Sequence, residues 1–204
     1  MKFDIGKTEF GIDVSFAVCV TLMLILDESG LGAIALFCSI IHEAAHIACL
    51  RFFGEKPASV RLSFYGIKLE RVPAANLGRL AEIAVYASGP AANIIVSTLL
   101  FLFSLVNDSL ETAAVISLMI GFFNLIPCCP LDGGNILKCI IDYHFEEEKV
   151  EKIVFAVSFA VVLPMTAAAV CVFIKTGNPT LLLVTAYILF VTLLNKSEKE
   201  YRFF

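Results

Sequence analysis

The pentapeptide His42-Glu43-Ala44-Ala45-His46 has the residue types and the spacing of a catalytic zinc site. On a helix, His42 and His46 lie one turn apart on the same face, so both imidazoles can bind one metal ion. Glu43 lies beside them and stays free to accept a proton from water at the metal. The motif therefore predicts two metal ligands and a general base for hydrolysis.

The pentapeptide lies within an apolar run, residues 31–53, that is long enough to cross a bilayer. Ionisable side chains are costly at that depth, and for this reason they usually mark a functional site. The alternative is that the three side chains only satisfy one another inside a helical bundle. We disfavour it, because this spacing seldom arises by chance in a chain with three histidines.

A third protein ligand is expected, because a catalytic zinc site has three protein ligands and an open position for water. The segment from Asn124 to Gly134, N-L-I-P-C-C-P-L-D-G-G, offers one carboxylate, Asp132. Its prolines and glycines break a helix, and irregular backbone at membrane depth occurs only where protein or a water-filled cavity covers it. Taken alone, Asp132 would be interpreted as a helix cap in a turn. Because the same chain contains the histidine pentapeptide, we predict that Asp132 is the third zinc ligand.

Hydrophobic residues make up 59% of the chain and charged residues 17%, which is typical of polytopic membrane proteins. Six apolar runs approach the length that crosses about 30 Å of hydrocarbon. They cover residues 12–27, 31–53, 80–106, 112–130, 150–174 and 179–195. We predict an all-α polytopic membrane protein with about six transmembrane helices in a single domain, residues 1–204. The amphipathic start, Met1 to Asp13, lacks a signal-peptide cleavage site, so we expect the first span to be retained.

Basic residues predict the orientation of these spans. Lys and Arg precede the first span, cluster between residues 51 and 79, and follow the sixth span. Such loops stay in the cytoplasm, so both termini are expected there. The net charge of −4 offers no footprint for nucleic acid, and the lipid bilayer is the expected environment.

Seven cysteines, most of them in apolar runs, do not form the pattern of a disulfide framework. We interpret them as small buried hydrophobic residues. Cys128 and Cys129 lie near the predicted metal site, but adjacent thiols do not match the spacing of zinc-binding cysteines. Zinc ligation by this pair is therefore disfavoured.

The third apolar run contains Gly89-Pro90-Ala91-Ala92-Asn93. Small residues allow close approach of a neighbouring helix, and Pro90 loosens the backbone. Asn93 can hydrogen-bond a substrate backbone or an active-site loop. From the residues alone, a packed and internally satisfied amide is nearly as good an interpretation.

Between the second and third runs, Ala58 to Val72 alternates apolar and polar residues around Tyr65-Gly66. This pattern predicts a short β-hairpin near the cytoplasmic active site. Leu62 and Phe64 lie on the strand whose edge we expect to hold an extended peptide by strand addition. The alternative is an interfacial ribbon with no substrate role.

The three motifs in this order resemble those of the site-2 protease family of intramembrane zinc metalloproteases. Within the family, the chain is most similar to the compact branch of stage IV sporulation protein FB, with an added span before the metal helix and two after the aspartate. The resemblance covers nearly all of the 204 residues. No PDZ or CBS domain is expected, so regulation by such domains is not implied.

The resemblance implies one Zn²⁺ per chain, held by His42, His46 and Asp132, with Glu43 as catalytic base. It also implies that Asn93 and Asn124 position the substrate or the active site. The expected activity is cleavage of a membrane-tethered or membrane-associated regulatory protein, such as an anti-sigma factor or a sigma-factor precursor, in a bacterial plasma membrane.

Two other functions stay open on the residues. In one, the same side chains bind an ion that a membrane transporter carries or that a regulatory protein senses. The chain lacks the internal repeat that many transporters have. In the other, an inactive homologue binds membrane peptides without cutting them, which the intact Glu43 disfavours.

Overall fold

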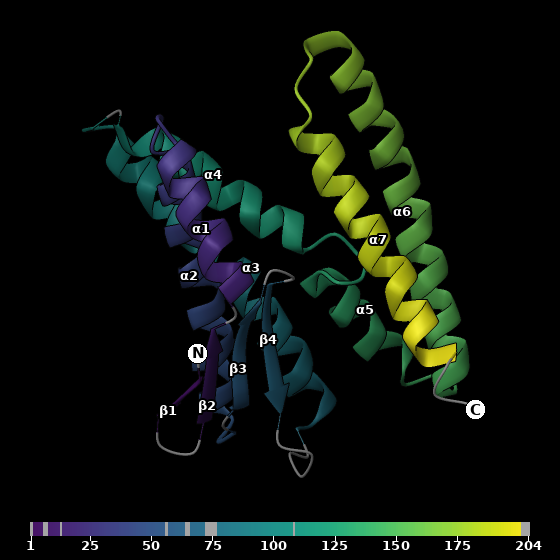
Figure 1. Ribbon diagram of the computed structural model, residues 1–204. Helices are drawn as coiled ribbons and strands as arrows, with labels where there is room; N and C mark the ends of the chain where they lie inside the picture. Colours follow the sequence, from purple (N-terminus) through teal and green to yellow (C-terminus); the bar gives the residue numbers. More distant parts are fainter. Residues whose placement is uncertain are drawn as a thin grey trace. The chain divides into compact units, whose positions relative to one another are not determined.

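The computed structural model describes residues 2–5, 8–12, 14–55, 57–63, 66–71, 77–107 and 109–200. The chain divides into two compact units, residues 1–122 and 123–204. The first holds a four-stranded sheet, α1 to α3 and nearly all of α4, and the second holds α5 to α7 (Figure 1). The single domain expected from the sequence stays a prediction.

Three helices of the described part are long and apolar enough to cross a membrane: α2, α3 and α6. Two others, α4 and α7, contain shorter apolar stretches at residues 110–124 and 180–193, and α1 has 13 residues. The bounds are α1 Val14–Leu26, α2 Leu31–Phe52, α3 Arg79–Ser104, α4 Ser109–Asn124, α5 Asp132–Ile141, α6 Glu147–Thr176 and α7 Thr180–Glu200. Three of the six predicted spans therefore correspond to helices that are long and apolar enough to cross a membrane. The other three spans remain a prediction.

Within the predicted fourth span, residues 112–130, the helix α4 ends at Asn124. Pro127 and Pro130 lack the N–H that a continuing helix needs, so residues 125–131 form a loop. A helix that the sequence did not predict, α5, begins directly after this loop at Asp132. Its two glycines, Gly133 and Gly134, disfavour a helix and hid it from pattern analysis.

Four strands form one sheet in the order β1-β2-β3-β4 (Figure 1). The strands are β1 (Lys2–Ile5), β2 (Thr8–Ile12), β3 (Pro57–Ser63) and β4 (Gly66–Arg71). Pairs β1–β2 and β3–β4 are antiparallel, whereas β2 and β3 run parallel. Strands β3 and β4 coincide with the alternating segment Ala58 to Val72. An all-α fold with one hairpin was thus an incomplete prediction, because the start of the chain adds β1 and β2.

The register corrects the expectation that the strand bearing Leu62 offers a free edge. Leu62 pairs with Ile12 of β2 on one side and with Ile67 of β4 on the other. An inner strand has no unpaired row of backbone groups for a peptide to join. Within the described strands, the outer ones are β1 and β4. Phe64 lies outside the described residues.

Helices α2 and α3 each bury one stripe of side chains at four-residue spacing. On α2 the stripe is Cys38, His42, His46 and Leu50; on α3 it is Val85, Gly89, Asn93 and Ser97. Residues four apart lie on one face of a helix, so each histidine lies on the face that packs inside the protein.

Serine hydroxyls join α3 to α4 inside this unit. Ser97 Oγ donates to Ala114 O at 2.7 Å, and Ser117 Oγ donates to Asn93 O at 3.0 Å. Interhelical hydrogen bonds of this kind stabilise helix pairs where lipid offers no polar partner. The α3 backbone around Asn93 is therefore fixed from α4.

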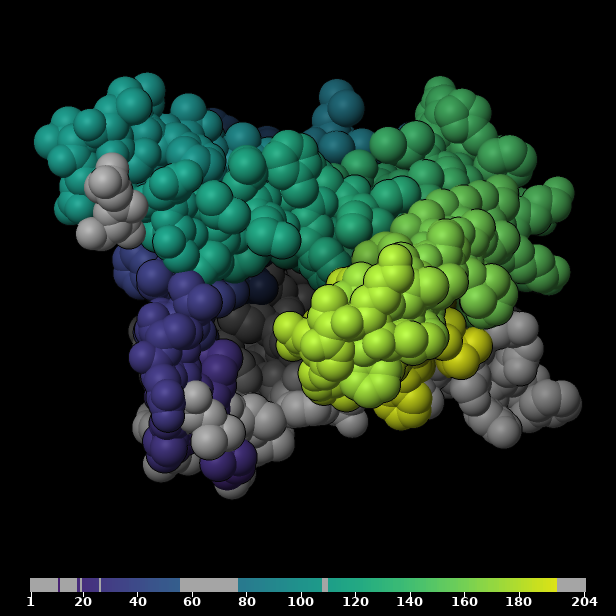
Figure 2. All heavy atoms as spheres, turned by 90° about the horizontal axis from the view of Figure 1, so that it is seen from above, coloured from purple at the N-terminus to yellow at the C-terminus, as the bar shows by residue number. Residues whose placement is uncertain are grey.

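In the second unit, α6 and α7 lie side by side (Figures 1 and 2). Buried Cys128, Val162 and Ile188 form a cluster against which Phe123, Ile126 and Leu131 pack. The loop before α5 is therefore anchored to both long helices.

Candidate metal centre

Asp27 fixes the start of α2, the helix that carries both histidines. Its Oδ2 accepts hydrogen bonds from the N–H groups of Gly32 at 2.7 Å and Ala33 at 3.2 Å, and its Oδ1 accepts one from Ser29 Oγ at 2.7 Å. The Ser29 hydroxyl, and then the two N–H groups, hold the pKa of Asp27 below its ordinary value. These bonds satisfy donors that a helix start leaves open.

His46 is buried and held by α3. Its Nδ1 lies 2.7 Å from Val85 O, an oxygen that also accepts from Ser88 Oγ at 2.7 Å. A carbonyl oxygen can only accept, so Nδ1 carries the hydrogen and the lone pair lies on Nε2. Metal-binding histidines usually have a second-shell partner of this type, which fixes the tautomer and the ring orientation.

Gly89 on α3 lies against the Nε2 atoms of both histidines. A Cβ atom at this position would lie 2.7 Å from His42 Nε2 and would overlap His46 Nε2. Both ring nitrogens therefore point to the same place, and only the missing side chain of Gly89 leaves room there. Two imidazole nitrogens close to the same position fit a bound metal ion.

His42 and Glu43, the other two residues of the pentapeptide with a predicted chemical role, differ in burial. His42 is buried, and its ring lies 4.8 Å from that of His46 at an interplanar angle of 79°. Glu43 is half-buried and follows His42 on α2. A partly accessible carboxylate next to two potential ligands can exchange protons with water and with a substrate.

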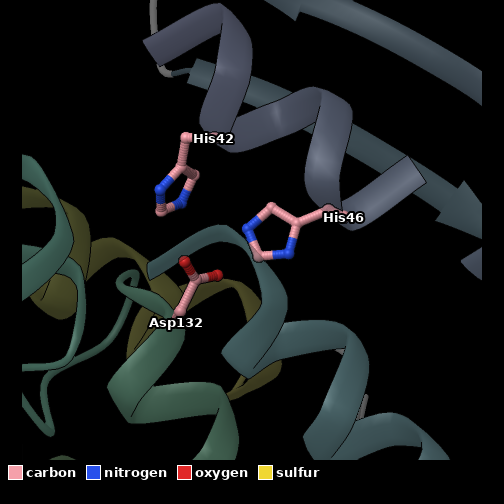
Figure 3. Close-up of side chains that lie close together, drawn as sticks. All are labelled: His42, His46 and Asp132. Atoms are coloured by element: carbon pink, nitrogen blue, oxygen red, sulfur yellow. The ribbon is translucent and has the colours of Figure 1, made fainter. Parts of the chain in front are cut away.

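His42, His46 and Asp132 form a group of potential metal ligands. One ligand atom from each lies within 4.8 Å of the others (Figure 3). Two imidazoles and one carboxylate are a donor set that suits zinc. Asp132 belongs to the second unit, so its role as third ligand is a proposal.

The surroundings of Asp132 within its own unit explain why two glycines follow it. A Cβ at Gly133 would overlap the carbonyl oxygen of Leu125, and one at Gly134 would lie 2.6 Å from Cys128 O. The first turn of α5 thus packs directly on the backbone of the preceding loop. A residue larger than glycine at position 133 or 134 would push the start of α5, and Asp132 with it, away from this loop.

Asp132→Ala should lower the affinity for zinc by about tenfold or more, because two ligands remain of three. The measurement is zinc content after dialysis against a graded series of chelator concentrations. Full retention of zinc would remove Asp132 from the ligand set.

The remaining predicted site residues are placed as follows. Asn93 is fully buried on α3, one turn after Gly89, and Asn124 is the last residue of α4 and half-buried. Leu62 lies on the inner strand β3. The six cysteines whose side chains the structure describes are free thiols, and Cys128 and Cys129 are not in the ligand group found among the described residues.

The residues that support the ligands were not predicted from the sequence. The Val85 carbonyl leaves no signal in a side-chain pattern. Gly89 did have one, since it opens the G-P-A-A-N segment, but its role needs the α2–α3 packing to be known.

Comparison with known proteins agrees with this geometry. Residues 104–165, which include Asp132, match Peptidase family M50. The chain is 27% identical over 190 residues to the zinc metalloprotease MJ0392 of Methanocaldococcus jannaschii, which covers 87% of this chain and 53% of the relative. Over residues 104–165 the chain resembles the M50 peptidases. The resemblance to site-2 proteases noted in the sequence is thereby confirmed.

Two further similarities extend this relationship. The chain is 28% identical over 167 residues to stage IV sporulation protein FB of Bacillus subtilis, which covers 80% of this chain and 56% of that protein. It thus spans about half the length of these two curated relatives. A solved structure, the site-2 protease from Methanocaldococcus jannaschii, matches with a TM-score of 0.70 at 22% identity, over 95% of this chain and 94% of that one. That match shows a shared fold.

Proposed function

We propose that this protein is an intramembrane zinc endopeptidase of the site-2 protease type. The observation that carries the proposal is the pair of buried histidines whose Nε2 atoms converge on Gly89. The hydrogen bond from His46 Nδ1 to Val85 O adds the second-shell partner of a metal ligand. Asp132 completes the proposed ligand set.

The chain's own residues would divide the work of peptide hydrolysis between them. Zinc, when bound, would supply the positive charge that lowers the pKa of water, so that the water can lose a proton near neutral pH and attack a carbonyl. A carboxylate oxygen of Glu43 takes the proton that the attacking water loses and passes it to the leaving amine nitrogen. His42, His46 and Asp132 hold the metal beside Glu43.

Asn93 has an unusual environment that supports a role in substrate binding. Its side chain is fully buried, and neither Oδ1 nor Nδ2 has a hydrogen-bond partner among the described residues. An unpaired buried amide lowers stability, so such groups are usually kept for a function. We propose that Asn93 hydrogen-bonds the backbone of the extended substrate, with Asn124 as a second polar group.

Asn93→Leu should therefore raise or preserve the midpoint of thermal unfolding while it slows cleavage by about 100-fold, the usual cost of a lost oxyanion or backbone contact. Zinc content should not change. Thermal unfolding, metal analysis and cleavage assays on the same preparation measure all three. An unchanged cleavage rate would show that Asn93 contributes to packing and not to substrate binding.

The protein is proposed to be a multi-pass protein of a bacterial plasma membrane with both termini in the cytoplasm. Helices α2, α3 and α6 meet the length and hydropathy expected of spans. The basic residues between α2 and α3 support a cytoplasmic position for β3 and β4. The three shorter apolar helices would supply the other spans.

A membrane-tethered or membrane-associated regulatory protein is the proposed substrate, of the anti-sigma factor or sigma-factor precursor type. Hydrolysis needs an extended peptide, because a helix hides its carbonyls in its own hydrogen bonds. An outer strand of the sheet can hold such a peptide by strand addition. Since β3 is an inner strand, we assign this role to β4, Gly66–Arg71.

Proline substitutions along β4 test this assignment. In an antiparallel edge strand, alternate N–H groups point away from the partner strand. Proline at Ile67, Lys68, Leu69 and Glu70 in turn should thus give alternating results, with cleavage reduced about tenfold where an outward N–H is lost and zinc content unchanged. Normal cleavage by all four variants would show that β4 does not bind the substrate backbone and would favour an interfacial ribbon without a substrate role.

A membrane ion transporter or a non-catalytic metal protein would use the same ligands, so the proposal is tested by activity. Purified protein in lipid vesicles should hold about one zinc per chain, cleave an unfolded reporter peptide, and pass no zinc across the bilayer. Zinc flux without peptide cleavage would favour the transporter. Zinc content near zero would overturn both.

A further inference from the structure

Ser158 and Thr192 bind both backbone groups of one loop residue, Cys129. The Cys129 N–H donates to Ser158 Oγ at 3.0 Å, and Thr192 Oγ1 donates to Cys129 O at 2.8 Å. Ser158 comes from α6 and Thr192 from α7. Two long helices thus hold the backbone of the same residue, one through its N–H and the other through its carbonyl.

Both hydroxyls are buried beside apolar side chains. Ser158 has no exposed surface and Thr192 has 2%. Neighbouring Cys128, Val162 and Ile188 are buried around them. Thr192 Oγ1 also lies 2.8 Å from Ile188 O in its own helix, so its single hydrogen is shared with the loop.

Cys129 is connected through backbone contacts to the helix that Asp132 begins. The N–H of Leu131 donates to Cys128 O at 2.8 Å, which closes a tight turn over the two intervening residues. At Gly134, a Cβ would lie 2.7 Å from Cys129 N. The Cys128–Cys129 peptide and the first turn of α5 therefore touch without a side chain between them.

Displacement of Cys129 would be transmitted to α5, because backbone atoms in direct contact cannot absorb a shift by changing rotamer. Asp132 is the first residue of that helix. A carboxylate ligand tolerates only small errors of position, since metal–oxygen distances are fixed at about 2.0–2.2 Å.

We infer that Ser158 and Thr192 are positioning residues for the Asp132 carboxylate. Through the backbone of Cys129, α6 and α7 set where the first turn of α5 lies. This inference rests on the proposed function, in which Asp132 binds zinc. It gives the two C-terminal helices a part in metal geometry as well as in the membrane anchor.

The test compares Thr192→Val with Thr185→Val, a matched control on the same helix. Both threonines are buried and both donate to the carbonyl four residues earlier in α7, but Thr192 also donates to Cys129 O in the loop. Thr192→Ser keeps the hydroxyl, and Ser158→Ala removes the second contact independently. The probes are Zn²⁺ affinity and the visible absorption spectrum of bound Co²⁺, which reports ligand geometry.

Thr192→Val and Ser158→Ala should each weaken Zn²⁺ binding by about tenfold, which is near the smallest loss of affinity usually found when a residue that supports a metal ligand is replaced. Both variants should also shift the absorption bands of bound Co²⁺. Thr192→Ser and Thr185→Val should match wild type. Equal affinity and spectra in Thr192→Val, Ser158→Ala and Thr185→Val would overturn the inference. If Thr192→Val does not fold, Ser158→Ala decides. Absence of metal binding by wild type would instead overturn the proposed function.

Discussion

Replacing Glu43 with glutamine should slow peptide cleavage by about 100-fold or more while the protein keeps its fold and its zinc. Glutamine has nearly the same volume as glutamate, so packing beside His42 is preserved. It cannot accept a proton from water, and general-base catalysis is lost. The measurement is the rate of reporter cleavage per zinc-loaded protein.

Glu111→Gln is the matched control, because Glu111 is an exposed residue in the first turn of α4. The same change there should leave the cleavage rate near that of wild type. Cleavage by Glu43→Gln at the wild-type rate would mean that another group accepts the proton.

Gly89→Ala should lower zinc affinity by about 100-fold or more, although glycine is neither a ligand nor a base. The new methyl group would occupy the space into which both Nε2 atoms point. Neither histidine can retreat easily, since α2 and α3 are packed and His46 is tied to Val85 O. Zinc titration with a competing chelator measures the effect.

Gly78→Ala controls for the change from glycine to alanine next to the same helix. Gly78 precedes α3, and a Cβ there would meet no atom within 4 Å. Its zinc affinity should equal that of wild type. Unaltered zinc binding by Gly89→Ala would show that the histidines bind no metal between themselves and α3.

The chemistry of the site was largely predictable because it is local in the sequence. His42, Glu43 and His46 are linked by helical periodicity alone, and a helix over these residues was all that the inference needed. Asp132 was predicted as a metal ligand because it is the carboxylate of a segment whose prolines and glycines disfavour a continuous helix. Neither inference required knowledge of the packing.

Features set by tertiary contacts could not be predicted. Ser158 and Thr192 are ordinary hydroxyl residues in apolar helices, where their usual partner is the carbonyl one turn earlier. Their contact with Cys129, 29 and 63 residues away along the chain, has no periodic signal. The same is true of the Val85 carbonyl that orients His46.

Strand pairing was predicted only where the pattern was local. Ala58 to Val72 alternates and turns within itself, so β3 and β4 could be expected. The parallel pairing of β2 with β3 joins Ile12 to Leu62 across 50 residues, which no local pattern encodes. For the same reason, the inner position of the strand that carries Leu62 could not be predicted.

The central claim, that the metal group cuts peptides of membrane proteins, is tested most directly by comparing membranes from source cells that produce wild type or Glu43→Gln. Labelling of new N-termini and mass spectrometry should find fragments of one or a few membrane proteins, cut in or next to an apolar segment, with wild type only. Identical fragments in both membranes, or none in either while the purified protein holds zinc, would contradict the claim.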